Sequence, residues 1–111
     1  MSSMNNGDIF LVEFQKSIGH EQSGFRPVII MSDTVAGMVT VVPLTSNAES
    51  TRFPHTLTIN AGPSNGLKVN SVALTFQITA VDQRRLMRKI GRMDGNMLKK
   101  VKKVLKDFLS L

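Results

Sequence analysis

Short apolar runs, separated by polar or glycine-containing turns, fill the first two thirds of the chain. Runs of this length that are rich in Val, Ile, Leu and Phe are typical of buried β-strands. We therefore expect five or more strands, at Ile9–Phe14, Val28–Met31, Met38–Val42, His55–Ile59 and Ser71–Phe76. The third run should end at Pro43, because proline interrupts strand pairing. Residues 82–92 fit either a further strand or a short helical turn.

The connections between these runs carry turn-forming residues. Ser32–Gly37 reads as a turn, and Asn60–Leu67 contains glycine, proline and asparagine, which is typical of a connection. The polar segment Ala48–Phe53 is expected to be mobile.

The last part of the chain predicts an amphipathic helix that begins after Asp94, a residue suited to capping a helix N-terminus. Apolar residues recur there at helical spacing, at Met97, Leu98, Val101, Val104, Leu105, Phe108 and Leu109. Lysines occupy the opposite face, at Lys99, Lys100, Lys102, Lys103 and Lys106. We expect the apolar stripe to pack on the sheet and the lysine face to be a solvated surface. Residues 1–111 then form one domain, mainly β with a C-terminal helix, built on a small curved antiparallel sheet or barrel.

The formal charge of +6 indicates a polyanionic partner, either a nucleic acid or an acidic protein segment. Most basic residues lie in the last third of the chain. The chain contains no cysteine, which excludes disulfides and thiolate chemistry. Its first residues lack the layout of a signal peptide, and no apolar run reaches membrane-spanning length, so we expect a soluble cytoplasmic protein without membrane contact.

Candidate chemistry is concentrated in the stretch Gly19–Pro27. His20, Glu21 and Gln22 precede the turn formers Ser23 and Gly24, which predicts that they lie on a loop. Pro27 favours an extended conformation for Arg26, which should stand at the mouth of the following strand. A surface loop in which Arg26 pairs with Glu21 is the alternative interpretation.

Three segments together resemble the MazF/PemK toxins: Gly7–Val12, Gly19–Ile30 and Val42–Ser46. Ser71, Val72, Gln77 and Asp82 continue the match, which extends over nearly the whole chain. The resemblance implies a CcdB/PemK-like, SH3-like barrel that forms a homodimer. It also implies a sequence-specific endoribonuclease that cleaves single-stranded mRNA without metal or cofactor and arrests translation. An antitoxin with an acidic, disordered segment would block the RNA groove.

Metal-free RNA cleavage can use the 2′-hydroxyl of the substrate as nucleophile, so alignment and charge stabilisation supply the rate. The resemblance assigns catalytic roles to Arg26, Thr45 and His20. Arg26 offers a permanent charge and a planar set of donors to phosphate, the Thr45 hydroxyl can donate to a nonbridging oxygen, and His20 can transfer protons. Substrate-binding roles are expected for Gln22, Glu21, Ser46 and Gln77. Without the resemblance, Thr45 reads as a turn hydroxyl at a strand end, and His20 as a loop residue bonded to Glu21.

The chain departs from some relatives at two positions. Leu74 and Phe76 stand where those relatives carry an Arg and an acidic residue, and Thr79 replaces a basic residue. A mechanism that depends on that Arg–acid pair does not transfer here. A non-catalytic toxin that binds gyrase as CcdB does, or a member that only binds RNA or antitoxin, is therefore the alternative. Phe76 reads either as a core residue or as a base-stacking platform. A metal-dependent nuclease is disfavoured, because the two histidines are far apart and no acidic cluster has ligand spacing.

Overall fold

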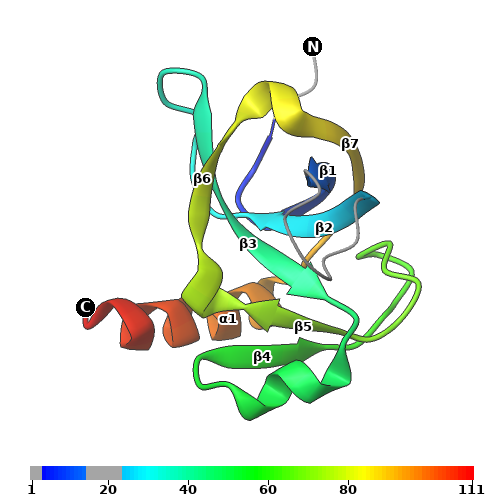
Figure 1. Cartoon of the computed structure of the whole chain (residues 1–111), viewed down its shortest axis with the longest axis vertical. Helices are drawn as coiled ribbons and strands as arrows, with labels where there is room; N and C mark the ends of the chain where they lie inside the picture. Colours follow the sequence, from blue (N-terminus) through cyan, green and yellow to red (C-terminus); the bar gives the residue numbers. More distant parts are fainter. Residues whose placement is uncertain (1–3, 15–23) are drawn as a thin grey trace.

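Seven strands, three 3-10 helices and one α-helix make up the computed structural model, which describes residues 4–14 and 24–111 (Figure 1). The strands are β1 (Asp8–Phe14), β2 (Gly24–Ile30), β3 (Met38–Thr45), β4 (Thr56–Ile59), β5 (Ser71–Leu74), β6 (Thr79–Asp82) and β7 (Leu86–Arg92). The 3-10 helices are η1 (Ala48–Arg52), η2 (Thr75–Gln77) and η3 (Gln83–Arg85), and α1 spans Gly95–Leu109. The prediction of a mainly β fold with a C-terminal helix is confirmed.

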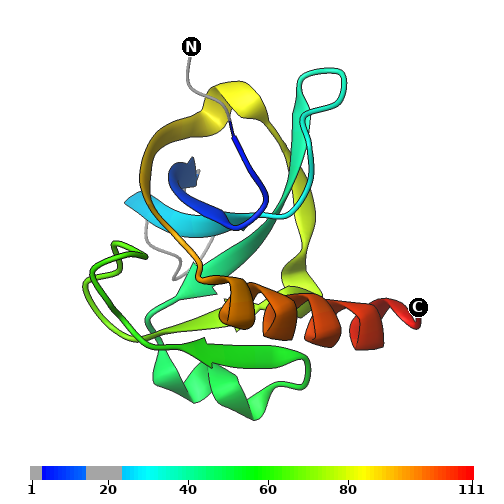
Figure 2. The same ribbon diagram turned by 180° about the vertical axis from the view of Figure 1, so that it is seen from behind.

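All strand pairings are antiparallel, and the sheet runs in the order β4-β5-β3-β2-β1-β7, with β6 paired to β3. The sheet curls strongly, so that β1, β2, β6 and β7 surround one part of the core (Figure 1). Helix α1 lies across the opposite end, against β4 and η2, as the reverse view shows (Figure 2). This is the curved antiparallel barrel that the strand pattern predicts.

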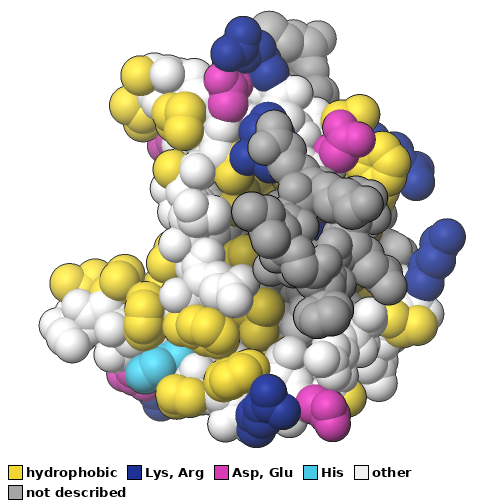
Figure 3. All heavy atoms as spheres, in the orientation of Figure 1, with side chains coloured by type: hydrophobic (Ala, Val, Ile, Leu, Met, Phe, Trp, Pro, Cys, Tyr) yellow, Lys and Arg dark blue, Asp and Glu magenta, His cyan; other side chains and the backbone are white. Residues whose placement is uncertain are grey.

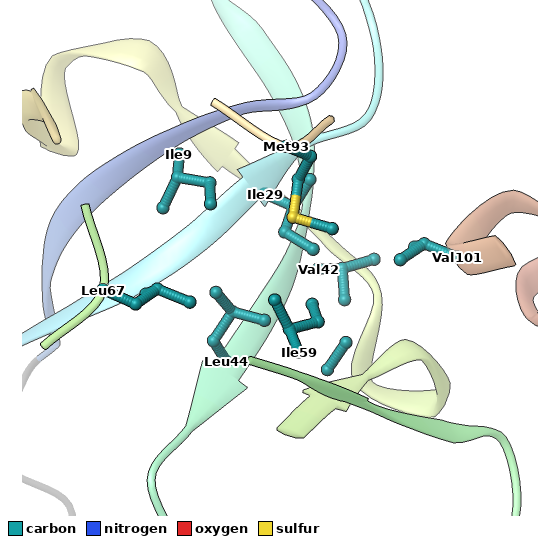
Figure 4. Close-up of a cluster of buried hydrophobic side chains, with 9 residues drawn as sticks. Ile9, Ile29, Val42, Leu44, Ile59, Leu67, Met93 and Val101 are labelled. Atoms are coloured by element: carbon teal, nitrogen blue, oxygen red, sulfur yellow. The ribbon is translucent and has the colours of Figure 1, made fainter. Parts of the chain in front are cut away.

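Two apolar clusters fill the interior, because strand residues alternate between the two faces of the sheet. In β2, Ile29 belongs to the first cluster, whereas Val28 and Ile30 belong to the second. The first cluster joins the sheet to α1 through Val101, which is fully buried, and to the segment after β4 through Leu67 (Figure 4). The core therefore fixes the positions of both the helix and that segment.

Strand β3 does not end at Pro43, and that part of the prediction is wrong. Pro43 is buried within the strand and lies opposite Val28 in β2. The next two residues, Leu44 and Thr45, pair with β5 instead of β2. Pro43 thus lies between the residues of β3 that pair with β6, which end at Val41, and those that pair with β5, which begin at Leu44. A missing N–H donor is tolerated at such an interruption between two ladders.

Other boundaries also differ from the predictions. Strand β2 begins at Gly24, so Arg26 lies within the strand, opposite Val12, rather than at its mouth. The predicted strand at 71–76 stops at Leu74, and Thr75 turns inward, where its hydroxyl donates to the carbonyl of His55.

The ambiguous region 82–92 contains both alternatives, a helical turn (η3) followed by β7. The polar segment 48–53 contains the short helix η1. Asn47 caps its N-terminus, because Asn47 Oδ1 accepts a hydrogen bond from the N–H of Glu49 at 3.0 Å.

Helix α1 follows its prediction closely. The Asp94 carboxylate accepts a hydrogen bond from the N–H of Met97 at 2.8 Å, which caps the N-terminus. Met97 and Leu98 pack against the first cluster, and all of the helix lysines are exposed. No helix in the part of the chain that the structure describes is long and apolar enough to cross a membrane.

Candidate functional site

A pocket of about 870 Å³ opens where strands β1, β2, β3 and β7 meet the segment between β4 and β5. Strand ends and the connecting segment supply its walls, and its described lining contains polar, apolar and cationic side chains. These are Leu11, Phe25, Arg26, Pro27, Leu44, Thr45, Ser46, Asn47, Gly66, Leu67, Lys68, Val69, Ser71, Arg88 and Ile90. A concave site with a few converging polar groups is the usual form of a binding or catalytic centre.

The pocket brings together Arg26, Thr45 and Ser46, three of the residues that the sequence singled out. They come from β2 and from the end of β3, which are separated along the chain but adjacent in the sheet. Gln77 lies elsewhere, on the exposed side of η2, and does not line the pocket. The predicted residues His20, Glu21 and Gln22 lie outside the described residues.

Thr45 is the last residue of β3 and is held by both its strand and the turn after it. Its backbone pairs with Val72 in β5, and its Oγ1 accepts a hydrogen bond from the N–H of Asn47 at 3.2 Å. That bond makes Thr45 a turn hydroxyl, and it uses an oxygen lone pair and not the hydroxyl hydrogen. The hydrogen therefore remains available to donate to a ligand in the pocket.

Arg26 is exposed near the start of β2. Arg26 pairs with Val12 of β1, and from Val28 onward the strand also pairs with β3, so the guanidinium extends from a segment anchored in the sheet. Among the described residues, no carboxylate forms an ion pair with Arg26. The alternative pairing with Glu21 falls outside the described residues.

Two cations in the lining, Lys68 and Arg88, were not predicted as site residues. Lys68 lies in a segment that the sequence marked only as a connection, and Arg88 lies in β7, whose structure the pattern left open. The concentration of basic residues in the last third of the chain was a signal for Arg88. No local signal distinguished Lys68.

The segment that carries Lys68 is fixed by its own side chains. Asn65 Oδ1 accepts hydrogen bonds from the N–H groups of Gly62 at 3.1 Å and Leu67 at 3.0 Å, while its Nδ2 donates to the Asn60 carbonyl at 2.9 Å. Asn70 Oδ1 accepts from the N–H of Ala61 at 2.8 Å and closes the base of the segment. The segment between β4 and β5 is thus held in one conformation by its own hydrogen bonds, and it forms one wall of the pocket.

The positions at which the chain departs from some relatives lie outside the described lining. Leu74 is buried at the end of β5. Phe76 is half-buried on η2, with its ring centroid 5.7 Å from that of Phe53 and the two rings tilted by 55°. Thr79 is exposed at the start of β6. Phe76 thus packs against another aromatic side chain at the surface, apart from Arg26 and Thr45.

Away from the pocket, Asp82 and Arg84 form an exposed ion pair. Hydrogen bonds from the Arg84 guanidinium and backbone N–H lower the pKa of Asp82 to about 2, and the same pairing raises the pKa of Arg84. Neither residue lines the pocket. In the described part of the chain, no three His, Cys, Asp or Glu side chains gather as a metal site would require.

Comparison with known proteins places residues 5–109 in the family described as PemK-like, MazF-like toxin of type II toxin–antitoxin system. MazF9 of Mycobacterium tuberculosis, named an endoribonuclease, is 32% identical over 117 residues that cover 97% of this chain and 98% of that protein. EndoA of Bacillus subtilis, also named an endoribonuclease, is 29% identical over 97% of this chain and 96% of its own length.

The fold has close counterparts among solved structures. MazF in the MazE–MazF crystal structure from Deinococcus radiodurans superposes with a TM-score of 0.80 at 25% identity, covering 100% of this chain and 99% of that one. MazF-mt6 of Mycobacterium tuberculosis superposes with a TM-score of 0.73 at 21% identity over 94% of this chain and 97% of its own. Since the family pattern spans almost every residue and the fold agrees with it, the chain belongs to the PemK-like, MazF-like toxins of type II toxin–antitoxin systems.

Proposed function

We propose that this protein is an endoribonuclease toxin that cleaves single-stranded mRNA at specific sequences without a metal ion, and so inhibits translation. The observation that carries the proposal is the meeting of Arg26 and Thr45 in one pocket whose described lining is cationic and contains no carboxylate. Such a pocket suits a phosphodiester. Membership of the toxin family and the names of the relatives, EndoA and MazF9, support the same activity.

The proposed reaction is an attack of the RNA 2′-oxygen on the adjacent phosphorus. A bond forms between the 2′-oxygen and phosphorus, the bond from phosphorus to the 5′-oxygen breaks, and the 2′-hydroxyl proton passes to a base. The leaving 5′-oxygen takes a proton from an acid. The products are a 2′,3′-cyclic phosphate and a 5′-hydroxyl.

Each catalytic residue has a role in this scheme. Arg26 stabilises the charge that develops on the nonbridging oxygens, and Thr45 donates its hydroxyl hydrogen to one of them. His20 transfers a proton as base or acid. Because the Asn47 N–H already holds the Thr45 oxygen, the hydroxyl is oriented before the substrate arrives.

Substrate binding is assigned to four further residues. Ser46 follows Thr45 in the pocket lining, and Glu21 and Gln22 precede Arg26 in the chain. Gln77 lies apart on η2, so its role in this proposal is to contact a more distant part of the bound RNA.

The proposed partners are a cognate antitoxin and a second copy of the chain. Solved relatives include MazE–MazF and an endoribonuclease with its cognate antitoxin from a mycobacterial species, which supports an antitoxin partner. An acidic segment that orders on the cationic pocket would block RNA. The homodimer is supported by apolar side chains exposed near the C-terminal end of α1 (Figure 3), among them Leu109 and Leu111.

The test incubates the purified protein with a long unstructured RNA in EDTA and maps the ends of the fragments. We expect discrete cuts with cyclic-phosphate and 5′-hydroxyl ends, lost in Arg26→Ala but retained in Arg52→Ala, which removes an exposed arginine outside the pocket lining. Light scattering and circular dichroism check the mass and fold of each protein. A folded wild-type protein that leaves the RNA intact would contradict the proposal and favour the non-catalytic alternative, with gyrase as the next partner to test.

A further inference from the structure

The pocket holds more positive charge than one phosphate requires. Its described lining includes three cationic side chains, Arg26 from β2, Lys68 from the segment before β5, and Arg88 from β7. It includes no described acidic side chain. All three cations are exposed, and together they give the pocket a positive potential that attracts a polyanion.

The fold places Lys68 and Arg88 on neighbouring walls through one close contact. Gly66 lies so near β7 that a Cβ on it would be 1.9 Å from the carbonyl oxygen of Ile90. Lys68 follows Gly66 by two residues, and Arg88 precedes Ile90 by two residues. The N–H of Arg92 also donates to the Ser64 carbonyl at 2.9 Å, which fastens the segment to β7 a second time.

The other described cations of this region are engaged with protein groups. Lys89 Nζ lies 3.3 Å and Arg92 Nη1 lies 3.9 Å from Oδ1 of the fully buried Asp8. Arg84 pairs with Asp82 at 2.8 Å, and Arg85 donates to the Glu13 carbonyl at 3.1 Å. Within the described residues, neither Lys68 nor Arg88 takes part in an ion pair.

The alternation of side chains along β7 explains why Arg88 lines the pocket whereas Lys89 pairs with Asp8. Arg88 lies opposite Leu11 of β1, and Leu11 in turn lies opposite Pro27 of β2. Directly opposed residues share a face of a sheet, and all three residues line the pocket. Lys89, the next residue, lies on the other face and reaches Asp8. Arg88 is therefore directed to the pocket by the strand itself.

We propose that Lys68 and Arg88 bind a phosphate of the RNA strand next to the scissile one, so that the pocket holds at least two consecutive phosphates. The inference rests on the proposed ribonuclease function and extends its substrate site. A volume of about 870 Å³ is at the upper end of the range for pockets that enclose one drug-sized ligand, roughly 300–1,000 Å³, which leaves room beyond a single nucleotide. Arg88 offers a planar set of donors, and Lys68 a compact charge.

Residues that hold a flanking phosphate act on binding rather than on the chemical step. We expect Lys68→Gln and Arg88→Gln each to raise KM about 5- to 30-fold, which corresponds to about 1–2 kcal/mol of binding free energy, and to leave single-turnover cleavage at saturation nearly unchanged. Removing a phosphate contact should also reduce the salt dependence of binding, by about 0.7 in the slope of log K against log salt for a single strand.

The experiment measures anisotropy of a fluorescent 2′-O-methyl RNA, which cannot be cleaved by its own 2′-oxygen, at several salt concentrations, alongside cleavage of the matching RNA. Lys99→Gln and Lys103→Gln remove the same charge from the exposed face of α1 and serve as controls. Lys68→Arg and Arg88→Lys should restore most of the affinity. Circular dichroism confirms that each variant is folded.

The outcomes separate the two proposals. Wild-type cleavage with Lys68 and Arg88 variants that bind like the α1 controls would overturn the flanking-phosphate site and leave the ribonuclease intact. Wild-type binding without cleavage, with affinity and salt slope reduced only in the Lys68 and Arg88 variants, would overturn the catalytic proposal and the scissile neighbour of this site, but would support Lys68 and Arg88 as a binding site for an RNA phosphate. A wild-type protein that does not bind the RNA overturns both.

Discussion

Gly66 and Ile90 approach so closely that the segment between β4 and β5 has no room for a side chain at that point. A Cβ on Gly66 would lie 1.9 Å from the Ile90 carbonyl oxygen, and the φ angle of Gly66 is +71°. Both features favour glycine: any side chain would clash with the Ile90 carbonyl, and residues with a Cβ rarely adopt a positive φ angle. The wall of the pocket that carries Lys68 depends on this contact.

Substitution of Gly66 tests that dependence. We expect Gly66→Ala to lower the free energy of unfolding by about 1–3 kcal/mol, because the left-handed conformation and the clash both add strain. It should also weaken RNA binding, since Lys68 moves with the segment. Gly62→Ala is the matched control, because nothing lies within 4 Å of its added Cβ. Urea unfolding measures both variants, and equal stabilities would refute the argument.

Thr45 offers a test of the proposed chemistry. Thr45→Val keeps the side-chain shape and removes the hydroxyl, so we expect cleavage to fall about 10²- to 10³-fold, as for loss of one donor to a developing negative charge. RNA affinity should change little. Thr45→Ser should retain most activity, and Thr58→Val on the exposed side of β4 should retain all of it. Single-turnover cleavage that is unaffected in Thr45→Val would remove Thr45 from the mechanism.

Removing the Asp94 cap of α1 should change the stability of the protein and not its RNA cleavage, because Asp94 does not line the pocket. Asp94→Ala removes the acceptor of the Met97 N–H, and we expect a loss of about 0.5–2 kcal/mol in the free energy of unfolding. Asp107→Ala, near the other end of the helix, should be neutral or slightly stabilising, because an acidic group there opposes the helix dipole. Thermal or urea unfolding compares the two. Equal losses would indicate that the Asp94 cap contributes nothing specific.

The pairing of Asp82 with Arg84 predicts a dependence on acid pH. The pKa of Asp82 is lowered from 3.8 to about 2, chiefly by the side-chain hydrogen bond from Arg84. A lowered pKa means that the pair stabilises the folded state above the unfolded pKa of about 3.9, and that this contribution is lost as the pH falls towards 2. NMR titration should show the Asp82 carboxyl returning towards 3.8 in Arg84→Ala and staying low in Arg52→Ala. An unchanged titration in Arg84→Ala would refute the pairing.

The features that were predictable from the sequence are those set by neighbours along the chain. Short apolar runs such as Val28–Met31 predict buried strands, because a strand that is covered on both faces buries successive side chains. Asp94 and the apolar residues after it predict a capped helix for the same local reason. Arg26 and Thr45, which line the pocket, were singled out through short, contiguous motifs that carry the family resemblance.

The features that were missed depend on contacts between distant parts of the chain. Pro43 reads as a strand terminator, and only the change of partner from β6 to β5 reveals why a strand can continue through it. Lys68 reads as part of a connection because nothing near it in sequence shows that Gly66 packs on Ile90. Gln77 matches a motif, yet the turn of η2 carries it away from the pocket.

The pairing of β1 with β7 has a consequence for the order of events during synthesis. It joins residues 8–12 to residues 86–92, so the pairing of β1 with β7 cannot form until β7 has left the ribosome. Sheets that depend on such distant pairings fold slowly, because the chain must first close a long loop. A nascent chain that already contains Arg26 and Thr45 therefore lacks the wall that Arg88 completes. The pocket therefore assembles only after residue 92 has been made, so the chain cannot bind its ligand there while the earlier strands are being translated.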